Sequence, residues 1–194
     1  MYFRRMAFFT LKYVINLILA IQEDLETVTL LETLSQKRTI IETGTSEPSC
    51  ITWSPNVDDL AIGTKKGNLV MFNHQSNEKN TCLGKHRDEI TCGRWTKGNL
   101  IILGSVDGSV TVSNKDGDTM WQILLEDAPI DLVPIEPTSM KSLALIIRLN
   151  AKILFCETLC DSKETGEIHL KEEYGQPIFH SLLPDSDVVI VVCD

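Results

Sequence analysis

One eleven-residue pattern occurs twice in this chain, and its spacing strongly limits the possible folds. Residues 63–73 read GTKKGNLVMFN, and residues 104–114 read GSVDGSVTVSN. Each copy has a glycine, a hydroxyl residue, two further residues, a second glycine, a small polar residue and an apolar run before a final Asn. The copies lie 41 positions apart (104 − 63). Repetition at such an interval is typical of proteins built from repeated supersecondary units.

The similarity extends upstream of each copy, where Trp53 and Trp95 lie 42 positions apart (95 − 53). Short apolar runs alternate with turn signals such as Pro55–Asn56 and Lys97–Gly98. Apolar runs bounded by turn residues predict strands. One unit of about 41 residues then holds four short strands, which predicts a blade of a β-propeller. The two tryptophans are expected to pack between neighbouring blades.

The repeated glycines have two different predicted roles. Gly67 and Gly108 follow polar residues and permit the tight turn between the second and third strands. Gly63 and Gly104 end the second strand, where we expect neighbouring blades to be too close for a Cβ atom. All four glycines are therefore predicted to be structural positions of the repeat.

Fainter copies on both sides predict an all-β chain that forms a partial β-propeller of about four blades, each with four antiparallel strands. Residues 1–16 are expected to be a leader of unclear structure, and residues 17–194 to be the propeller. The expected blade pieces are 17–48, 49–83, 84–128, 129–174 and 175–194. Propellers close with four to eight blades, and the end pieces resemble interior pieces. We therefore expect an incomplete ring that is a fragment of a larger propeller.

The N-terminal segment allows an alternative. Residues 6–21 are largely apolar and follow two arginines, which is compatible with a signal sequence or a membrane anchor. The segment is shorter than the roughly 20 apolar residues of a spanning helix, and Lys12 and Asn16 interrupt it. A membrane-tethered binding domain is the alternative to a propeller scaffold.

Charge and composition make several other functions improbable. The formal net charge of −9, without a long Lys/Arg run, argues against nucleic-acid binding. Six cysteines lie mostly in apolar or Thr-rich runs and are expected to be free thiols. The four histidines have no metalloprotease spacing, and no phosphate-binding glycine loop occurs. We expect no enzymatic activity, no cofactor, no metal site and no small-molecule substrate.

The repeat resembles the WD-repeat family. Residues 84–90, GKHRDEI, resemble the Gly-His element that precedes a blade, and residues 106–108 resemble its Asp-bearing turn. His86, Ser105 and Asp107 match three positions of the hydrogen-bond network that the family has. The Trp-Asp dipeptide is replaced by Ser113–Asn114, so the resemblance implies at most a partial network. In the earlier copy Lys65–Lys66 replace the Asp-bearing pair, which implies that this blade has no such network.

A narrower resemblance covers residues 60–122, which are similar to the N-terminal propeller of the WD-repeat protein 19 family. GNLVMFNHQ, LGKHRDEITCGRW and TVSNKDGDT carry it. It implies a non-enzymatic protein–protein interaction scaffold whose partners are further subunits of intraflagellar transport complex A. It also implies a place in the cilium and cytoplasm, with a role in retrograde ciliary transport and in delivery of membrane proteins to cilia. Binding would then use hairpin tips such as 56–59, 65–68 and 97–99.

Overall fold

Antiparallel β-sheets make up the computed structural model of the chain. The structure describes residues 7–8, 18–22, 24–56, 58–136, 143–150, 152–157, 165–168, 177–182 and 189–193. Within these ranges there are eighteen strands and no helix. Four sheets contain four strands each in chain order, and β17 and β18 form a two-stranded sheet. The all-β prediction is therefore confirmed.

The first two sheets span the N-terminal half of the repeat region. The first contains β1 (Ala7–Phe8), β2 (Ile18–Gln22), β3 (Thr27–Glu32) and β4 (Arg38–Glu42). The second contains β5 (Pro48–Trp53), β6 (Asp59–Thr64), β7 (Leu69–Asn73) and β8 (Lys79–Cys82). We refer to these two sheets as blades 1 and 2.

Three further sheets follow. Blade 3 contains β9 (Ile90–Trp95), β10 (Ile101–Ser105), β11 (Ser109–Ser113) and β12 (Thr119–Leu124). Blade 4 contains β13 (Asp131–Ile135), β14 (Ala144–Arg148), β15 (Ile153–Glu157) and β16 (Thr165–Ile168). The last sheet pairs β17 (Pro177–Leu182) with β18 (Val189–Cys193).

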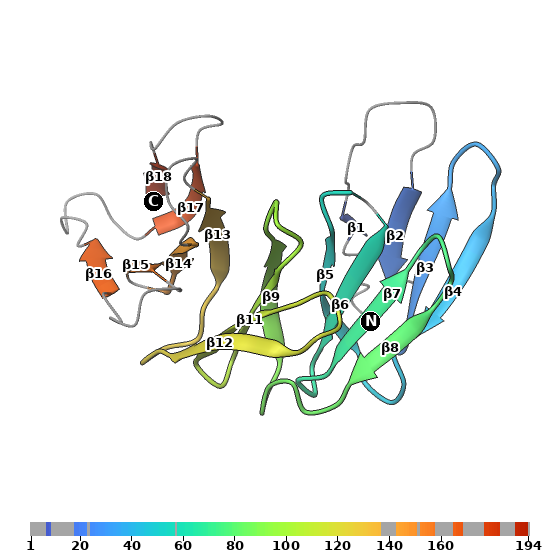
Figure 1. Ribbon diagram of the computed structural model, residues 1–194, viewed down its shortest axis with the longest axis horizontal. Helices are drawn as coiled ribbons and strands as arrows, with labels where there is room; N and C mark the ends of the chain where they lie inside the picture. Colours follow the sequence, from blue (N-terminus) through green and yellow to red (C-terminus); the bar gives the residue numbers. More distant parts are fainter. Residues whose placement is uncertain are drawn as a thin grey trace.

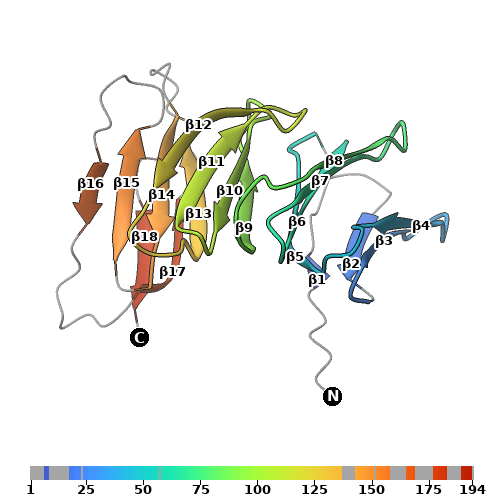
Figure 2. The same ribbon diagram turned by 90° about the horizontal axis from the view of Figure 1, so that it is seen from below.

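The sheets stand side by side along an arc that does not close into a ring (Figure 1). The first strand of each of the middle blades lies towards the inner side of the arc, and the fourth strand lies at the outer side (Figure 1). Strand β9 is adjacent to both β5 and β13, so consecutive blades contact each other through their inner strands. Figure 2 shows the same row of sheets from the edge. This is the partial propeller that the 41-residue repeat predicts.

Apolar clusters fill the spaces between blades, because each sheet has one apolar face towards each neighbour. Blades 1 and 2 share a cluster that includes Val28, Ile41 and Ile62. Blades 2 and 3 share a second cluster around Leu69 and Ile90. Blades 3 and 4 share a third, which extends from β10 to β15. No single central core exists in the described part, so the stability of each blade depends on its neighbours.

Strand positions agree with the sequence-based expectation in the two clear copies and differ near the ends. Strands β9 and β12 have the predicted bounds. Strand β8 begins two residues before the predicted 81–83, and β16 begins before the predicted 167–172. Strand β1 was not predicted; it pairs with β2 in the register Ala7↔Ile21 and supplies a first strand for blade 1. Most other residues of the predicted leader lie outside the described residues.

Candidate functional site

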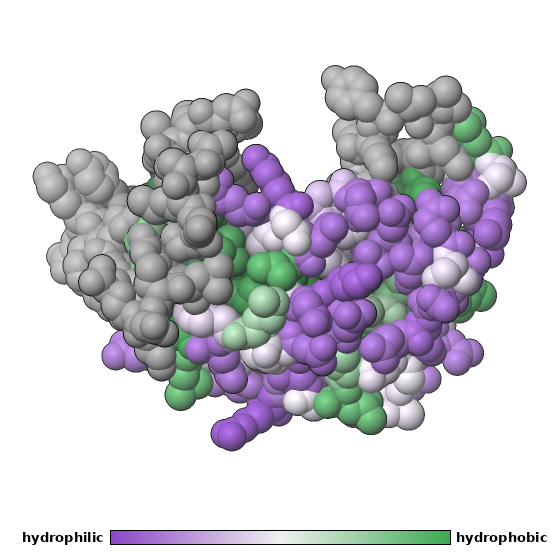
Figure 3. All heavy atoms as spheres, viewed as in Figure 1, coloured by the Kyte–Doolittle hydropathy of each residue, from purple (hydrophilic) through white to green (hydrophobic). Residues whose placement is uncertain are grey.

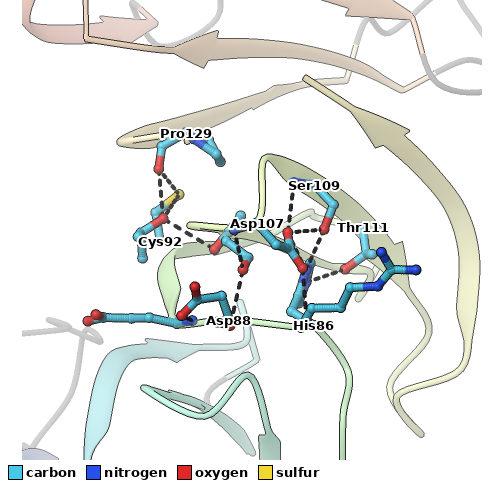
Figure 4. A network of polar contacts seen from close by, with 12 residues as sticks. His86, Asp88, Cys92, Asp107, Ser109, Thr111 and Pro129 are labelled. Carbon is cyan, nitrogen blue, oxygen red and sulfur yellow. Dashed lines mark hydrogen bonds and ion pairs between the residues drawn. The ribbon is translucent and has the colours of Figure 1, made fainter. Parts of the chain in front are cut away.

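The most connected polar cluster surrounds His86, in the loop of residues 84–89 that joins β8 to β9 (Figure 4). The His86 Nδ1 atom lies 2.8 Å from the Ser109 hydroxyl oxygen. The His86 Nε2 atom lies 3.0 Å from the Thr111 hydroxyl oxygen. The side chain of His86 has no solvent exposure. Both ring nitrogens therefore have the hydrogen-bond partners that a buried imidazole requires.

Asp107 connects the histidine loop to the turn between β10 and β11 (Figure 4). Its Oδ2 atom accepts a hydrogen bond from the backbone N–H of Arg87 at 2.8 Å. Its Oδ1 atom accepts one from the Ser109 backbone N–H at 2.8 Å and one from the Ser109 hydroxyl at 2.5 Å. The same Oδ1 atom lies 3.7 Å from His86 Nδ1. One carboxylate thus fixes both the loop and the turn.

The protonation states follow from burial and hydrogen bonding. Burial lowers the pKa of His86, and the neighbouring Asp107 only partly opposes this effect. Burial alone would raise the pKa of Asp107, but the hydrogen bonds from Ser109 and Arg87 outweigh it, and the pKa is lowered. At neutral pH the imidazole is neutral and the carboxylate is charged. A buried neutral histidine whose two nitrogens are already bonded is suited to holding a loop in place.

Ser105, which the resemblance groups with His86, makes different contacts. Its hydroxyl donates to the Asp88 carbonyl at 3.1 Å and accepts the backbone N–H of Asp107 at 3.2 Å. Ser109 and Thr111 bond to His86 instead, and the sequence interpretation missed both. The available signal was the alternation of hydroxyl residues along 109–113, which places them on one face of a strand.

Ser113 is the third hydroxyl residue of that face and stands where the family resemblance expects a tryptophan. It has no solvent exposure. Its Oγ atom has no hydrogen-bond partner among the described residues. The small side chain therefore adds nothing to the His86 cluster, and the network of blade 3 consists of histidine, aspartate and two hydroxyls.

Blade 2 joins the corresponding loop and turn by different side chains. Lys65 Nζ forms an ion pair with Glu47 at 2.7 Å. The backbone N–H of Lys66 donates to the Ser46 hydroxyl at 3.1 Å. The two lysines therefore replace the aspartate of blade 3 and contact the loop that precedes their own blade. Half-exposed ion pairs of this kind stabilise weakly, so the joint of blade 2 is the less strongly held.

Two of the repeated glycines lie where blades approach each other most closely. A Cβ atom on Gly63 would lie 2.6 Å from Ile90 Cγ2 of the next blade. A Cβ atom on Gly104 would lie 2.6 Å from Pro129 Cγ, again in the next blade. Real Cβ atoms do not approach other atoms so closely, so the inner strand of the following blade has to move for any larger residue.

The other two glycines combine a special backbone conformation with close packing. Gly67 has a φ angle of +73° and Gly108 one of +78°. A Cβ atom on Gly67 would overlap the carbonyl oxygen of His86, and one on Gly108 would lie 2.9 Å from the carbonyl oxygen of Leu125. The Gly67 carbonyl also accepts the His86 N–H, and the Gly108 carbonyl accepts the Leu125 N–H. Each turn thus contacts the loop that leads to the next blade.

Trp53 and Trp95 occupy equivalent settings in the two blades. They are 7% and 8% exposed, and each belongs to the apolar cluster shared with the preceding blade. Trp95 Nε1 donates to the Thr52 carbonyl of blade 2 at 3.2 Å. Trp53 contacts His74 edge to face, with ring centroids 6.4 Å apart. The prediction that both tryptophans pack between blades agrees with this geometry.

Hydroxyl groups on the inner strands also connect adjacent blades at repeated positions. The Ser49 hydroxyl donates to the Ile90 carbonyl at 2.7 Å, from β5 to β9. The Thr91 hydroxyl donates to the Pro129 carbonyl at 2.7 Å, from β9 towards blade 4 (Figure 4). Ser49 and Thr91 lie 42 positions apart (91 − 49). The repeat thus specifies the joint between blades as well as each blade.

Several other site types were searched for in the described part of the chain. No group of three or more His, Cys, Asp or Glu side chains there could hold a metal ion. No helix in those ranges has the length and hydrophobicity to cross a membrane. Five cysteines are free thiols, and Cys160 lies outside the described residues. These observations leave the surfaces of the blades, and the loops that join them, as the candidate functional regions.

Comparisons of fold define the class of this protein. The chain superposes on the structure of U3-55K with a TM-score of 0.65 and 15% identity, over 78% of this chain and 48% of that one. A chain of the mitotic checkpoint complex gives a TM-score of 0.60 and 16% identity, over 77% and 47%. Together with the 41-residue repeat and the His86–Asp107 loop, these likenesses identify a WD-repeat β-propeller.

Sequence comparisons identify the family. A family profile described as WDR19 first beta-propeller matches residues 15–192, and the chain belongs to that family. It is 33% identical over 147 residues to human WD repeat-containing protein 19 and covers 73% of this chain. It is 24% identical over 156 residues to the Caenorhabditis elegans WD repeat-containing protein dyf-2, over 77% of this chain. The matched part spans 11% of the length of each of these relatives.

Proposed function

We propose that this chain is a non-enzymatic scaffold of intraflagellar transport complex A, acting in retrograde ciliary transport and in delivery of membrane proteins to cilia. The observation that carries the proposal is the match of residues 15–192 to the first propeller of the WDR19 family. The geometry supports a scaffold role, because its most connected polar groups hold loops and blades together. The proposed location is the cilium and the cytoplasm.

A propeller performs such a role by presenting loops on a rigid frame. In blade 3 the loop 84–89 is held by Asp107 at one side and by the Gly67 carbonyl at the other. Its exposed residues, Arg87 and Asp88, are therefore presented in a fixed arrangement. A fixed loop loses little conformational entropy when a partner binds.

Co-purification tests the proposal. The full chain, with an affinity tag, is expressed in ciliated cells, and the bound fraction is probed with antibodies against complex A subunits. The expected result is recovery of those subunits with the wild-type chain. As a matched control, Gly67→Val disrupts a turn through the His86 carbonyl and is expected to reduce recovery, whereas Gly98→Ala has space for its methyl group. Absence of complex A subunits from the wild-type sample contradicts the proposal.

The second candidate is a membrane-tethered or generic WD-repeat binding domain of another complex. The largely apolar character of residues 6–21 is the observation that favours it. Carbonate extraction of membranes separates the two functions. A tethered chain stays in the membrane pellet at high pH, whereas a scaffold held by protein contacts is released to the supernatant. Loss of pellet retention on deletion of residues 1–17 would establish tethering.

A further inference from the structure

Two leucines are unusually exposed at equivalent positions of neighbouring blades. Leu83 follows β8 and is 78% exposed, and Leu124 ends β12 and is 75% exposed. They lie 41 positions apart (124 − 83), so they occupy the same place in the repeat. Figure 3 shows separate hydrophobic areas at the margin of the molecule near the ends of these two strands. A single exposed leucine is ordinary, but its recurrence at the same repeat position is not explained by the fold.

The two leucines are connected across one continuous surface. The backbone next to Leu83 bonds to blade 2, since the Gly84 N–H donates to Asn68 Oδ1 at 2.9 Å. Leu124 pairs with Ser109 in the register of β11 and β12, beside the turn of blade 3. Between them lies Val106, which is 45% exposed and whose N–H donates to the carbonyl of the histidine loop. We call Leu83, Val106 and Leu124 the apolar rim.

Acidic side chains accompany the apolar rim. Asp88 and Asp127 are exposed and Glu89 is partly exposed, and none of the three forms an ion pair within the described ranges. Of the cations in the same loop, Arg87 is exposed and Lys85 donates to the backbone of the β11–β12 hairpin. The surface therefore carries uncompensated negative charge, in a chain whose net charge is −9.

We propose that the apolar rim is a docking surface for a cationic amphipathic segment of a partner protein. Apolar side chains of the segment cover Leu83 and Leu124, and its Lys or Arg side chains face Asp88 and Asp127. Burial of apolar area supplies affinity, and the carboxylates supply orientation and a faster encounter. This inference rests on the proposed scaffold function and assigns it a surface and a partner chemistry.

Two synthetic peptides test the proposed partner chemistry. Both are 18 residues long with the same leucine positions; one has lysine and the other has glutamate at the polar positions. Fluorescence anisotropy with the full chain is expected to show saturable binding of the lysine peptide, at least about tenfold tighter than binding of the glutamate peptide. Raising the salt concentration weakens the binding, because exposed charges are screened. Equal affinity for the two peptides overturns the proposal.

Matched variants locate the binding surface. Leu83→Ser with Leu124→Ser is expected to weaken the lysine peptide at least about tenfold, because two apolar contacts are lost. Leu34→Ser with Ile40→Ser removes side chains that are 62% and 66% exposed on blade 1, and is expected to change affinity less than about twofold. Equal losses in the two double variants overturn the proposal. Circular dichroism checks that both variants fold.

Charge reversal provides an independent measurement. Asp88→Lys with Asp127→Lys is expected to weaken the lysine peptide and to strengthen the glutamate peptide, which a general loss of structure does not do. The same variant is then tested for recovery of complex A subunits. Normal recovery with altered peptide selectivity supports both proposals, whereas normal recovery with unchanged selectivity removes the docking surface and leaves the scaffold function standing.

Discussion

Ile90 of β9 occupies the space that a side chain on Gly63 of β6 would need, with 2.6 Å between its Cγ2 atom and an ideal Cβ atom on that glycine. The two residues belong to neighbouring blades, and Ile90 is completely buried. The Ser49 hydroxyl also donates to the Ile90 carbonyl. The distance between blades 2 and 3 is therefore fixed by one side chain against one backbone.

Gly63→Ala is expected to destabilise the chain by about 1–3 kcal/mol, because the added methyl group forces Ile90 and its strand to move. Urea denaturation followed by circular dichroism measures the change. The matched control is Gly98→Ala, whose Cβ would lie 3.7 Å from its nearest neighbour, Thr96 Oγ1. Coupling to Ile90→Ala in a double-mutant cycle should exceed about 0.5 kcal/mol. Additive effects would show that the two residues do not interact.

His86 is expected to make stability depend on pH below about 6.5, the ordinary pKa of histidine. Burial lowers its pKa in the folded chain. As the pH falls, the unfolded chain therefore takes up this proton first, and the folded state loses stability. The contribution of His86 is fully present above that ordinary pKa and decreases towards its lower folded pKa. Urea denaturation between pH 7.5 and 5 measures this slope.

His86→Gln supplies the comparison for the pH series, because glutamine can bond to hydroxyls and does not titrate. It is expected to cost about 1–3 kcal/mol at pH 7.5 through imperfect bonding to Ser109 and Thr111. The difference between the two unfolding free energies should shrink as the pH falls, at no more than about 1.4 kcal/mol per pH unit. A difference that is constant from pH 7.5 to 5 would mean that His86 does not titrate in this range.

Trp53→Ala is expected to destabilise the chain by about 3–5 kcal/mol, because the side chain is 7% exposed between blades 1 and 2 and leaves a cavity. Trp95→Ala should have a similar effect and also leaves the Thr52 carbonyl without its donor. Leu34→Ala, on an exposed side chain, serves as the control. A loss below about 1 kcal/mol for Trp53→Ala would contradict its place in the core.

Cys50 and Cys92 are expected to resist alkylation in the folded chain. Burial raises the pKa of Cys50 to about 12 and that of Cys92 to about 11, so neither thiol ionises at pH 8. Cys82 is only partly buried and should react at least about tenfold faster with iodoacetamide. Mass spectrometry of timed samples gives the three rates. Equal rates under native conditions would show that the inner strands are open to solvent.

The repeat spacing was sufficient to predict the blades, because four strands in 41 residues is a local pattern that each unit carries by itself. The roles of Gly67 and Gly108 were also readable, since the turn between two strands needs a positive φ angle whatever lies nearby. Strand β1 was not predicted, because two residues that pair with β2 show no periodicity of their own.

Contacts between units could be inferred only in outline. The sequence placed Gly63 and Gly104 near a neighbouring blade, but only the tertiary structure shows that Ile90 and Pro129 are the residues they meet. The sequence assigned Ser105 to the histidine cluster, whereas the structure bonds His86 to Ser109 and Thr111. Local periodicity fixes which residues form a strand and which way they face. The docking of one sheet on another selects the partners, because many side chains of the right type compete for each contact.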